Sequence, residues 1–355
     1  MNQLMSQIIQ SIRHASRLTR FITLVLVGMT MSGYASAAND EPSNNLASSN
    51  QELKIVATIK PIQLLINDIR GQKNAAEVLL KDNQNHHVTS LKPSQLKMVT
   101  DADIVFYIDQ DFETFLTKIM RKDNEGRTRY VALGDTPGMR LLSIRESGQM
   151  PHTFVEGGNY YQGSYASQKT AISSFHAGHA GSAIDWHIWL SPDNAIVMLR
   201  AIRDVLIEVE PHKAQLYNKN FDRHADKLVN YSMQTAKRIK SVMYTPFFIL
   251  HDGYQYFEEQ YGLQAKATIL RHGETTPSLR HLHTLKQTQK NKKVMIVLKD
   301  YQFSDHPIRA LSADNNLQVI NLDSLGLNLS EDTFSYIDFI TSFTDDFFAG
   351  LSYKN

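Results

Sequence analysis

Short apolar runs alternate with amphipathic stretches in the first half of the chain, beginning at residue 53. The apolar runs predict strands, which would lie at 53–58, 75–80, 103–108 and 129–133. The amphipathic stretches between them predict helices at 61–69, 93–99 and 112–120. Pro61 and Pro93 stand where the first turn of a helix accepts proline. Strands that alternate with helices are typical of a parallel sheet with both faces covered.

Residues 134–184 interrupt this alternation. They are rich in Gly, Ser and Tyr, contain His152, His176 and His179, and show little periodicity. A loop of this length is usually functional or disordered. We therefore expect a flexible loop with few contacts to either side of it.

A long polar-amphipathic stretch follows WHIWLSP (186–192) and the helix expected after Pro192. It begins at Pro211, continues to Met243 and is closed off by Pro246. As one helix it would be about 50 Å long, which is longer than a small domain is wide. We expect it to join two lobes.

Alternation returns after this helix. Strands are predicted at 247–250, 267–270, 294–298 and 318–322, with helices at 254–261 and 277–287 and a last helix through Phe348. The predicted fold is therefore α/β, with two lobes, each a parallel β-sheet flanked by helices, joined by one long helix. The N-terminal lobe would comprise 53–208, the linking helix 209–243 and the C-terminal lobe 244–355.

The first 37 residues have the pattern of a secretory signal peptide. Arg13, Arg17 and Arg20 precede an apolar run from Phe21 to Met31, and Ala-Ser-Ala at 35–37 supplies a cleavage site. The alternative, an N-terminal membrane anchor, is disfavoured because the run is only about half the roughly 20 residues that span a bilayer. Residues 38–52 would form a flexible polar leader. A secreted chain without a lipid anchor is best contained in a Gram-negative periplasm.

Composition narrows the possible chemistry. The 355 residues include no Cys, which excludes disulfides, Cys-rich zinc sites and thiol nucleophiles. Lys and Arg (37) nearly balance Asp and Glu (36), so there is no basic surplus for nucleic acid. Any soft-metal site must use imidazole and carboxylate, and the chain has 14 His.

Three of these histidines occupy comparable places. His87 follows the second predicted strand, His187 precedes a predicted helix, and His251 ends the strand FFIL. Ligands of α/β proteins collect at the carboxyl ends of strands, so one cleft could gather the three imidazoles, a set that suits Zn²⁺. Chance scatter of histidines and helix capping would explain the same positions, because the spacings form no local motif.

Three segments, NHHVTSLKPSQL, DWHIWLSPDNA and FILHDGYQYFEEQYGL, occur in this order along the chain. They resemble the signature segments of the cluster A-I solute-binding proteins, the metal-capturing components of ABC importers, and especially the zinc-specific periplasmic branch. The resemblance extends over roughly residues 53–350. It implies a metal site between the lobes.

The resemblance places His87, His187 and His251 on the family's metal ligands. Manganese-binding relatives have Glu where this chain has His251, and a third imidazole favours zinc. The fourth ligand stays open: Asp323 aligns with the acidic residue that closes the site in several relatives, while His86 or a water molecule are alternatives.

Other residues carry weaker expectations. His152, His176 and His179 lie where zinc members carry a metal-gathering loop, or they belong to a solvated loop. Asp185 could orient His187 or simply cap the next segment. His281 and His283 are expected at the surface. Four aromatic residues are expected in the core or the wall of the cleft: Trp186, Trp189, Tyr254 and Phe257. Glu274 is expected near the cleft, without an assignable role.

The function implied is capture of Zn²⁺ and its delivery to an inner-membrane zinc ABC permease by a monomer that is not an enzyme. Three alternatives remain: a manganese- or iron-binding member of the same family, a periplasmic zinc buffer or chaperone without an importer, and a zinc hydrolase. The hydrolase is disfavoured because the chain has no HExxH motif and no motif for a Ser nucleophile.

Overall fold

The computed structural model of the chain describes residues 53–81, 90–123, 126–145, 184–271, 276–312, 317–330 and 332–352. Within these ranges, no helix is both long enough and apolar enough to cross a membrane.

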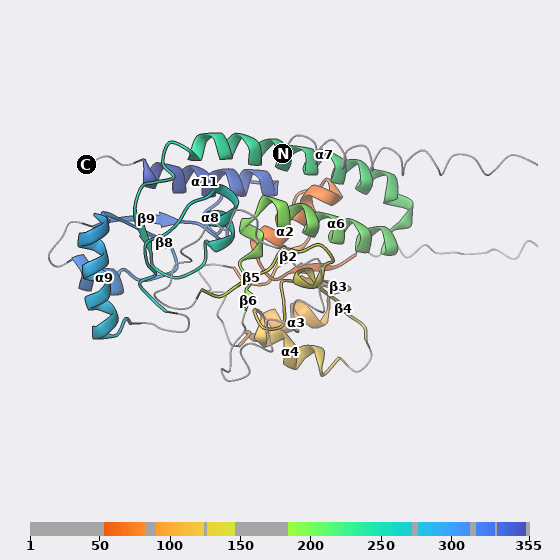
Figure 1. The fold of residues 1–355 in the computed structure, drawn as a ribbon. Helices are drawn as coiled ribbons and strands as arrows, with labels where there is room; N and C mark the ends of the chain where they lie inside the picture. The colour runs from red at the N-terminus through yellow and green to blue at the C-terminus, as the bar shows by residue number, and fades with distance from the viewer. Residues whose placement is uncertain are drawn as a thin grey trace, which may run out of the picture. The chain divides into compact units, whose positions relative to one another are not determined.

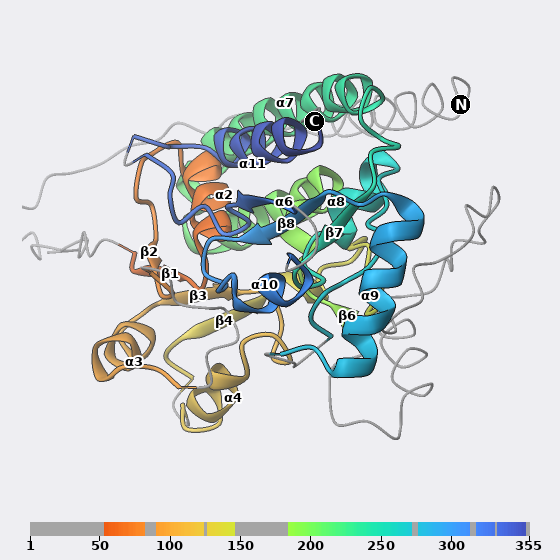
Figure 2. The same cartoon turned by 90° about the vertical axis from the view of Figure 1, so that its left-hand side faces the viewer.

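The first sheet is built from the predicted N-terminal strands, and its order in the described residues is β2-β1-β3-β4 with all neighbours parallel. Its strands are β1 (Ile55–Ala57), β2 (Glu77–Val78), β3 (Ile104–Tyr107) and β4 (Arg129–Ala132). The helices that follow the strands are α2 (Lys60–Arg70), α3 (Pro93–Thr100) and α4 (Thr114–Met120). Figures 1 and 2 show α2 on one face of this sheet and α3 and α4 on the other. The covered faces explain why the strands read as continuous apolar runs.

The second sheet has the order β7-β8-β9, again parallel. It consists of β7 (Phe247–Ile249), β8 (Ile296–Asp300) and β9 (Gln318–Leu322). Its helices are α8 (Gln255–Tyr261), α9 (Leu279–Lys292), α10 (His306–Ser312) and α11 (Tyr336–Leu351). Successive residues of β7 face opposite sides, so Phe247 packs on Phe347 of α11 while Phe248 packs in a second cluster with Ile308 of α10. The predicted α/β fold class is confirmed.

The predicted helix 211–243 is shorter in the structure. Pro211–Lys213 form a single 3₁₀ turn, and α7 runs from Ala214 to Ile239 before a turn leads to Pro246. At 26 residues α7 is about 39 Å long rather than 50 Å. It packs against α6 (Pro192–Val209), α2 and α11, and Figures 1 and 2 show α7 and α11 side by side.

The expectation for residues 134–184 is wrong for their described ends. Leu133–Asp135 form a 3₁₀ turn, and β5 (Leu142–Ser143) pairs antiparallel with β6 (Ile184–Asp185). Leu142 and Ser143 are also bound by α8, because the Leu142 amide donates to Tyr256 Oη (2.9 Å) and Gln255 Nε2 donates to the Ser143 carbonyl (3.1 Å). This end of the segment is therefore held by tertiary contacts that local periodicity does not record.

Two further elements differ from expectation. The predicted strand 267–270 runs beside β7, accepting a backbone hydrogen bond from Ile249 at Ala267 and donating one to Ile249 from Ile269, yet it forms only an isolated bridge at Thr268. Helix α10 was not predicted, since its seven residues are too few to show a helical period.

The N-terminal and C-terminal halves also contact each other directly, without α7. Asn67 of α2 donates to the Phe334 carbonyl (3.1 Å), and the indole of Trp189 donates to the Ser324 carbonyl (2.7 Å). One apolar cluster runs from Ile55 of β1 to Leu351 of α11. The linking helix is therefore not the only connection between the two halves.

Candidate metal centre

His187 is held by the residue two positions before it. It follows β6 and precedes the 3₁₀ turn Ile188–Leu190. One oxygen of Asp185, Oδ1, accepts the His187 backbone amide (3.0 Å) and lies 2.6 Å from its Nδ1. Because an ionised carboxylate only accepts, Nδ1 carries the proton in this contact, and in the neutral ring Nε2 carries the lone pair that a metal ion would use. Both expected roles of Asp185, orienting the ring and capping the backbone, are present in this geometry.

His251 sits in a tight turn after β7, where the Gly253 amide donates to the His251 carbonyl (3.0 Å). Its Nδ1 lies 3.3 Å from Asp300 Oδ2, and the Phe303 ring packs against the imidazole with centroids 4.5 Å apart and planes tilted by 37°. A Cβ added at Gly253 would lie 2.4 Å from His251 Nε2, closer than real contacts allow. Any larger residue at position 253 would therefore displace the imidazole, which lies against the backbone of Gly253.

These two histidines come together. Their ring centroids are 5.6 Å apart, although they follow strands of different sheets. Both are buried, with 7% exposure for His187 and 9% for His251. Imidazole is a ligand that suits a cation such as Zn²⁺, so this pair could supply two of the three or four ligands that such an ion takes.

Asp300 is a site residue that sequence reasoning missed. It ends β8, is fully buried, and accepts hydrogen bonds from Tyr254 Oη (2.9 Å) and the Ser324 amide (3.1 Å). Burial raises the pKa of its carboxyl, although these hydrogen bonds and His187 lower it. The sequence contains one signal for Asp300: it follows the carboxyl end of the predicted strand 294–298, just as His251 follows the carboxyl end of the predicted strand 247–250.

The acidic surroundings change the basicity of His187. Burial by itself lowers the pKa of this imidazole, but the charge and hydrogen bond of Asp185, followed by the charges of Asp300 and Asp252, raise it above its ordinary value. The same negative field that retains a proton in the apo protein favours a divalent cation in its place.

Asp323 lies in the loop after β9 and is engaged elsewhere. Its Oδ1 accepts the Leu327 amide (2.8 Å) and its Oδ2 the Asn328 amide (2.7 Å). Among the described residues no group of three or more His, Asp and Glu could hold a metal, so the structure does not join Asp323 to His187 and His251 in one ligand set.

Several predicted residues lie outside the described part of the chain. These are His86, His87, His152, His176, His179 and Glu274. Of the two helical histidines, His283 is exposed as expected, but His281 is buried with Nε2 3.0 Å from the Thr268 carbonyl, so its surface assignment is wrong. The expected core or cleft-wall aromatic residues are all buried: Trp186, Trp189, Tyr254 and Phe257.

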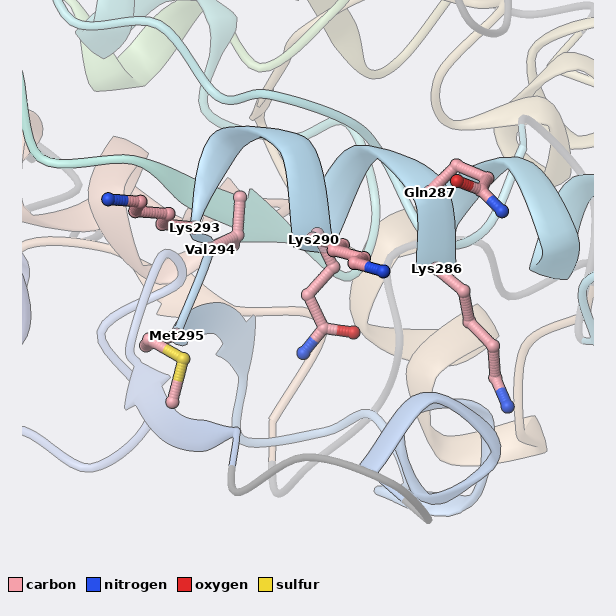
Figure 3. Close-up of a pocket in the computed structure, with 7 residues that line it drawn as sticks. Lys286, Gln287, Lys290, Lys293, Val294 and Met295 are labelled. Atoms are coloured by element: carbon pink, nitrogen blue, oxygen red, sulfur yellow. The ribbon is translucent and has the colours of Figure 1, made fainter.

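A pocket of about 450 Å³ lies at the other end of the second sheet (Figure 3). It is lined by the end of α9 and the start of β8, including Lys286, Lys290 and Met295. His251 follows the carboxyl end of β7, whereas this pocket adjoins the amino end of the parallel strand β8. It is therefore separate from the paired histidines.

Comparison with known proteins gives a family match. Residues 55–349 match the family model described as ZnuA, zinc-uptake complex component A, periplasmic. A relative named high-affinity zinc uptake system protein ZnuA from Brucella abortus is 27% identical over 286 residues, which cover 78% of this chain and 85% of the relative. The protein of the same name from Yersinia pestis is 26% identical over 307 residues, covering 86% and 92%.

Solved structures share the fold. A crystal structure of ZnuA superposes with a TM-score of 0.66 at 21% identity, covering 84% of this chain and 99% of that one. A ZnuA deletion mutant with zinc bound gives 0.65 at 20% identity, covering 85% and 99%. The AdcAII protein of Streptococcus pneumoniae gives 0.66 at 17% identity, covering 85% and 99%.

Proposed function

Since this chain belongs to the family of the periplasmic zinc-uptake component A, we propose that it captures Zn²⁺ in a Gram-negative periplasm and delivers it to an inner-membrane ABC permease. The relatives from Brucella abortus and Yersinia pestis carry the name of a high-affinity zinc uptake system protein. The chain would act after cleavage of residues 1–37, as a monomer, and as a carrier rather than an enzyme.

The observation that carries this proposal is the buried pair His187 and His251. Two imidazoles with centroids 5.6 Å apart, each beside an aspartate, suit a borderline ion such as Zn²⁺ better than the harder Mn²⁺. We propose His87 as the third ligand. Asp323, His86 or water would supply the fourth, and Asp323 would have to give up hydrogen bonds from two backbone amides to do so.

Metal analysis of the protein purified from periplasm tests the proposal. We expect one tightly bound Zn²⁺ per chain, and at least tenfold weaker binding by chelator competition when His87, His187 or His251 is replaced by Ala. The buried His281 provides a matched control, because it lies on α9 and its Nε2 contacts the Thr268 carbonyl. His281→Ala should leave the zinc affinity unchanged.

Several outcomes would contradict the proposal. A His187→Ala protein that still binds one equivalent with unchanged affinity would remove this residue from the site. Tighter binding of Mn²⁺ than of Zn²⁺ would favour the manganese alternative. Normal zinc-limited growth of cells that lack the protein would indicate a buffer rather than an uptake component.

A further inference from the structure

The two-stranded ribbon β5–β6 supports His187 directly. Its strand β6 ends at Asp185, whose carboxylate holds the His187 ring and backbone. Tyr256 of α8 fixes the ribbon at the same point, donating from Oη to the Asp185 carbonyl (2.6 Å) and accepting the Leu142 amide (2.9 Å). The ribbon is therefore fastened to an element of the second sheet.

Arg145, two residues after β5, reaches the turn that carries His251. Its Nε donates to both oxygens of Asp252 (3.0 and 2.9 Å), and its Nη2 also contacts that carboxylate. Its Nη1 and Nη2 donate to the two oxygens of Glu258 (3.1 and 3.0 Å). The exposed fractions of these side chains are 9% for Arg145, 20% for Asp252 and 3% for Glu258.

This geometry needs the planar fork of arginine. A guanidinium can bind two carboxylates side by side, whereas a lysine ammonium is a point charge that cannot reproduce both pairs. Glu258 is in turn fixed from the other side, because its Oε2 accepts the Ala265 amide (2.9 Å). Glu258 thus fixes the guanidinium of Arg145, and the guanidinium in turn fixes the carboxylate of Asp252.

Fixing Asp252 also fixes His251. The two residues are adjacent, and the Gly253 amide donates to the His251 carbonyl across the same turn (3.0 Å). The imidazole lies against Gly253 and Phe303, so a displacement of this turn would move the ring relative to its contacts.

We propose that Arg145 is a positioning residue for metal binding, which acts through Asp252 to place His251. The ribbon would then place His187 through Asp185, and the segment that follows β5 would place His251 through Arg145. This inference rests on the proposed zinc-binding function and adds a residue that would not itself touch the ion.

Arg140 provides a matched control. It precedes β5 on the same segment and pairs with Glu259, the neighbour of Glu258 on α8. That pair is exposed, with 42% and 41% of the two side chains accessible, and involves no residue of the His251 turn. Removing it deletes the same charge and the same kind of tie to α8 without touching Asp252.

The test measures zinc affinity of the whole mature chain by chelator competition for Arg145→Lys, Arg145→Ala, Asp252→Asn and Arg140→Ala. We expect at least tenfold weaker binding for both Arg145 variants and for Asp252→Asn, and a change below about twofold for Arg140→Ala. Arg145→Lys keeps the charge and supplies the measurement if Arg145→Ala does not fold.

A double-mutant cycle with His251→Ala separates positioning from general stability. If Arg145 acts through His251, Arg145→Lys should not weaken zinc binding further once His251 is gone. Fully additive losses, or Arg145 variants that bind zinc as tightly as Arg140→Ala, would overturn the inference while leaving the proposed function intact. Absence of zinc binding by the unsubstituted chain would overturn both.

Discussion

A single oxygen of Asp185 contacts His187 twice, once at the backbone amide and once at Nδ1. The two contacts fix the position of the residue and the rotation of its ring together. Carboxylates that hold metal-binding histidines in this way set the tautomer and strengthen the ligand. At the scale of single residues, binding should therefore depend on side chains that do not touch the ion.

Asp185→Asn should weaken zinc binding by about 10- to 100-fold, because an amide supplies neither the charge nor the obligate acceptor that directs Nδ1–H. The measurement is chelator competition at neutral pH. Asp193→Asn, an exposed change in the first turn of α6, is the control and should leave affinity as it was. Equal affinities of the two variants would show that Asp185 only caps the backbone.

Gly253→Ala should weaken zinc binding at least tenfold, because the new methyl group would occupy the space of His251 Nε2 and push the ring aside. Gly350→Ala is the control, since its Cβ would lie 2.9 Å from Ile320, away from the histidines. The control should lower the melting temperature without changing affinity. Unchanged affinity in Gly253→Ala would mean that the binding position of the ring differs from the one seen here.

At the scale of elements, α2, α7 and the start of α11 meet at Asp68. Its Oδ2 accepts the Tyr336 amide (3.1 Å), and its Oδ1 lies 3.3 Å from His224 Nδ1. Burial raises the pKa of Asp68 to about 7, although hydrogen bonds from Ser335 and Tyr336 lower it. Burial, with the charges of Arg223 and Lys227, lowers the pKa of His224 to about 4.

The two groups affect stability in opposite directions between pH 4 and pH 6.5. The contribution of Asp68, whose pKa is raised, is complete below the unfolded value and is lost as pH rises through about 7. The stabilising contribution of His224, whose pKa is lowered, is complete above the pKa of the unfolded state and is lost as pH falls through about 4. Between pH 4 and pH 6.5 the two contributions therefore change the free energy of unfolding in opposite directions and largely cancel.

Asp68→Asn should remove the opposing contribution, so that the pH dependence due to His224 becomes measurable. As pH drops from 6.5 to 4.5, the free energy of unfolding of the Asp68→Asn protein should fall by about 2 kcal/mol more than that of the unsubstituted protein. Urea unfolding at several pH values measures this, with the exposed Asp332→Asn as control. Parallel pH profiles for Asp68→Asn and the control would show that the two groups are not linked in this way.

At the scale of the whole molecule, we expect the apolar core to form without metal. One cluster of buried side chains extends from β1 through α2, α6 and α7 to α11, and a second fills the space between the second sheet and helices α9 and α10. A chain of this size buries enough apolar surface to fold by itself, unlike a zinc finger.

Zinc should therefore stabilise the fold without creating it. Binding to the native state alone adds about 4 kcal/mol at a thousandfold excess of free metal over Kd. In the presence of a chelator the far-UV circular dichroism should persist and melting should stay cooperative at a lower temperature. A disordered spectrum without metal would contradict this expectation.

The sequence by itself determined the elements that local patterns of apolar residues and prolines mark. The apolar runs of β1, β3, β8 and β9 and the prolines at the starts of α2, α3 and α6 are local signals, and the structure follows them within a few residues. Resemblance identified His187 and His251, which the structure brings together, and His87 and the fourth ligand stay predictions. Asp323, by contrast, binds its own loop.

Only the tertiary structure decided how these elements support the site. Arg145 and Asp252 are 107 residues apart, Asp300 lies 49 residues after His251, and the burial of His281 depends on Thr268 in a neighbouring segment. Such contacts have no period and no local spacing. They exist because segments far apart in the chain, such as the antiparallel ribbon β5–β6 and the neighbouring parallel strands β7 and β8, end near one another. A burial pattern along the chain cannot show which ends will meet.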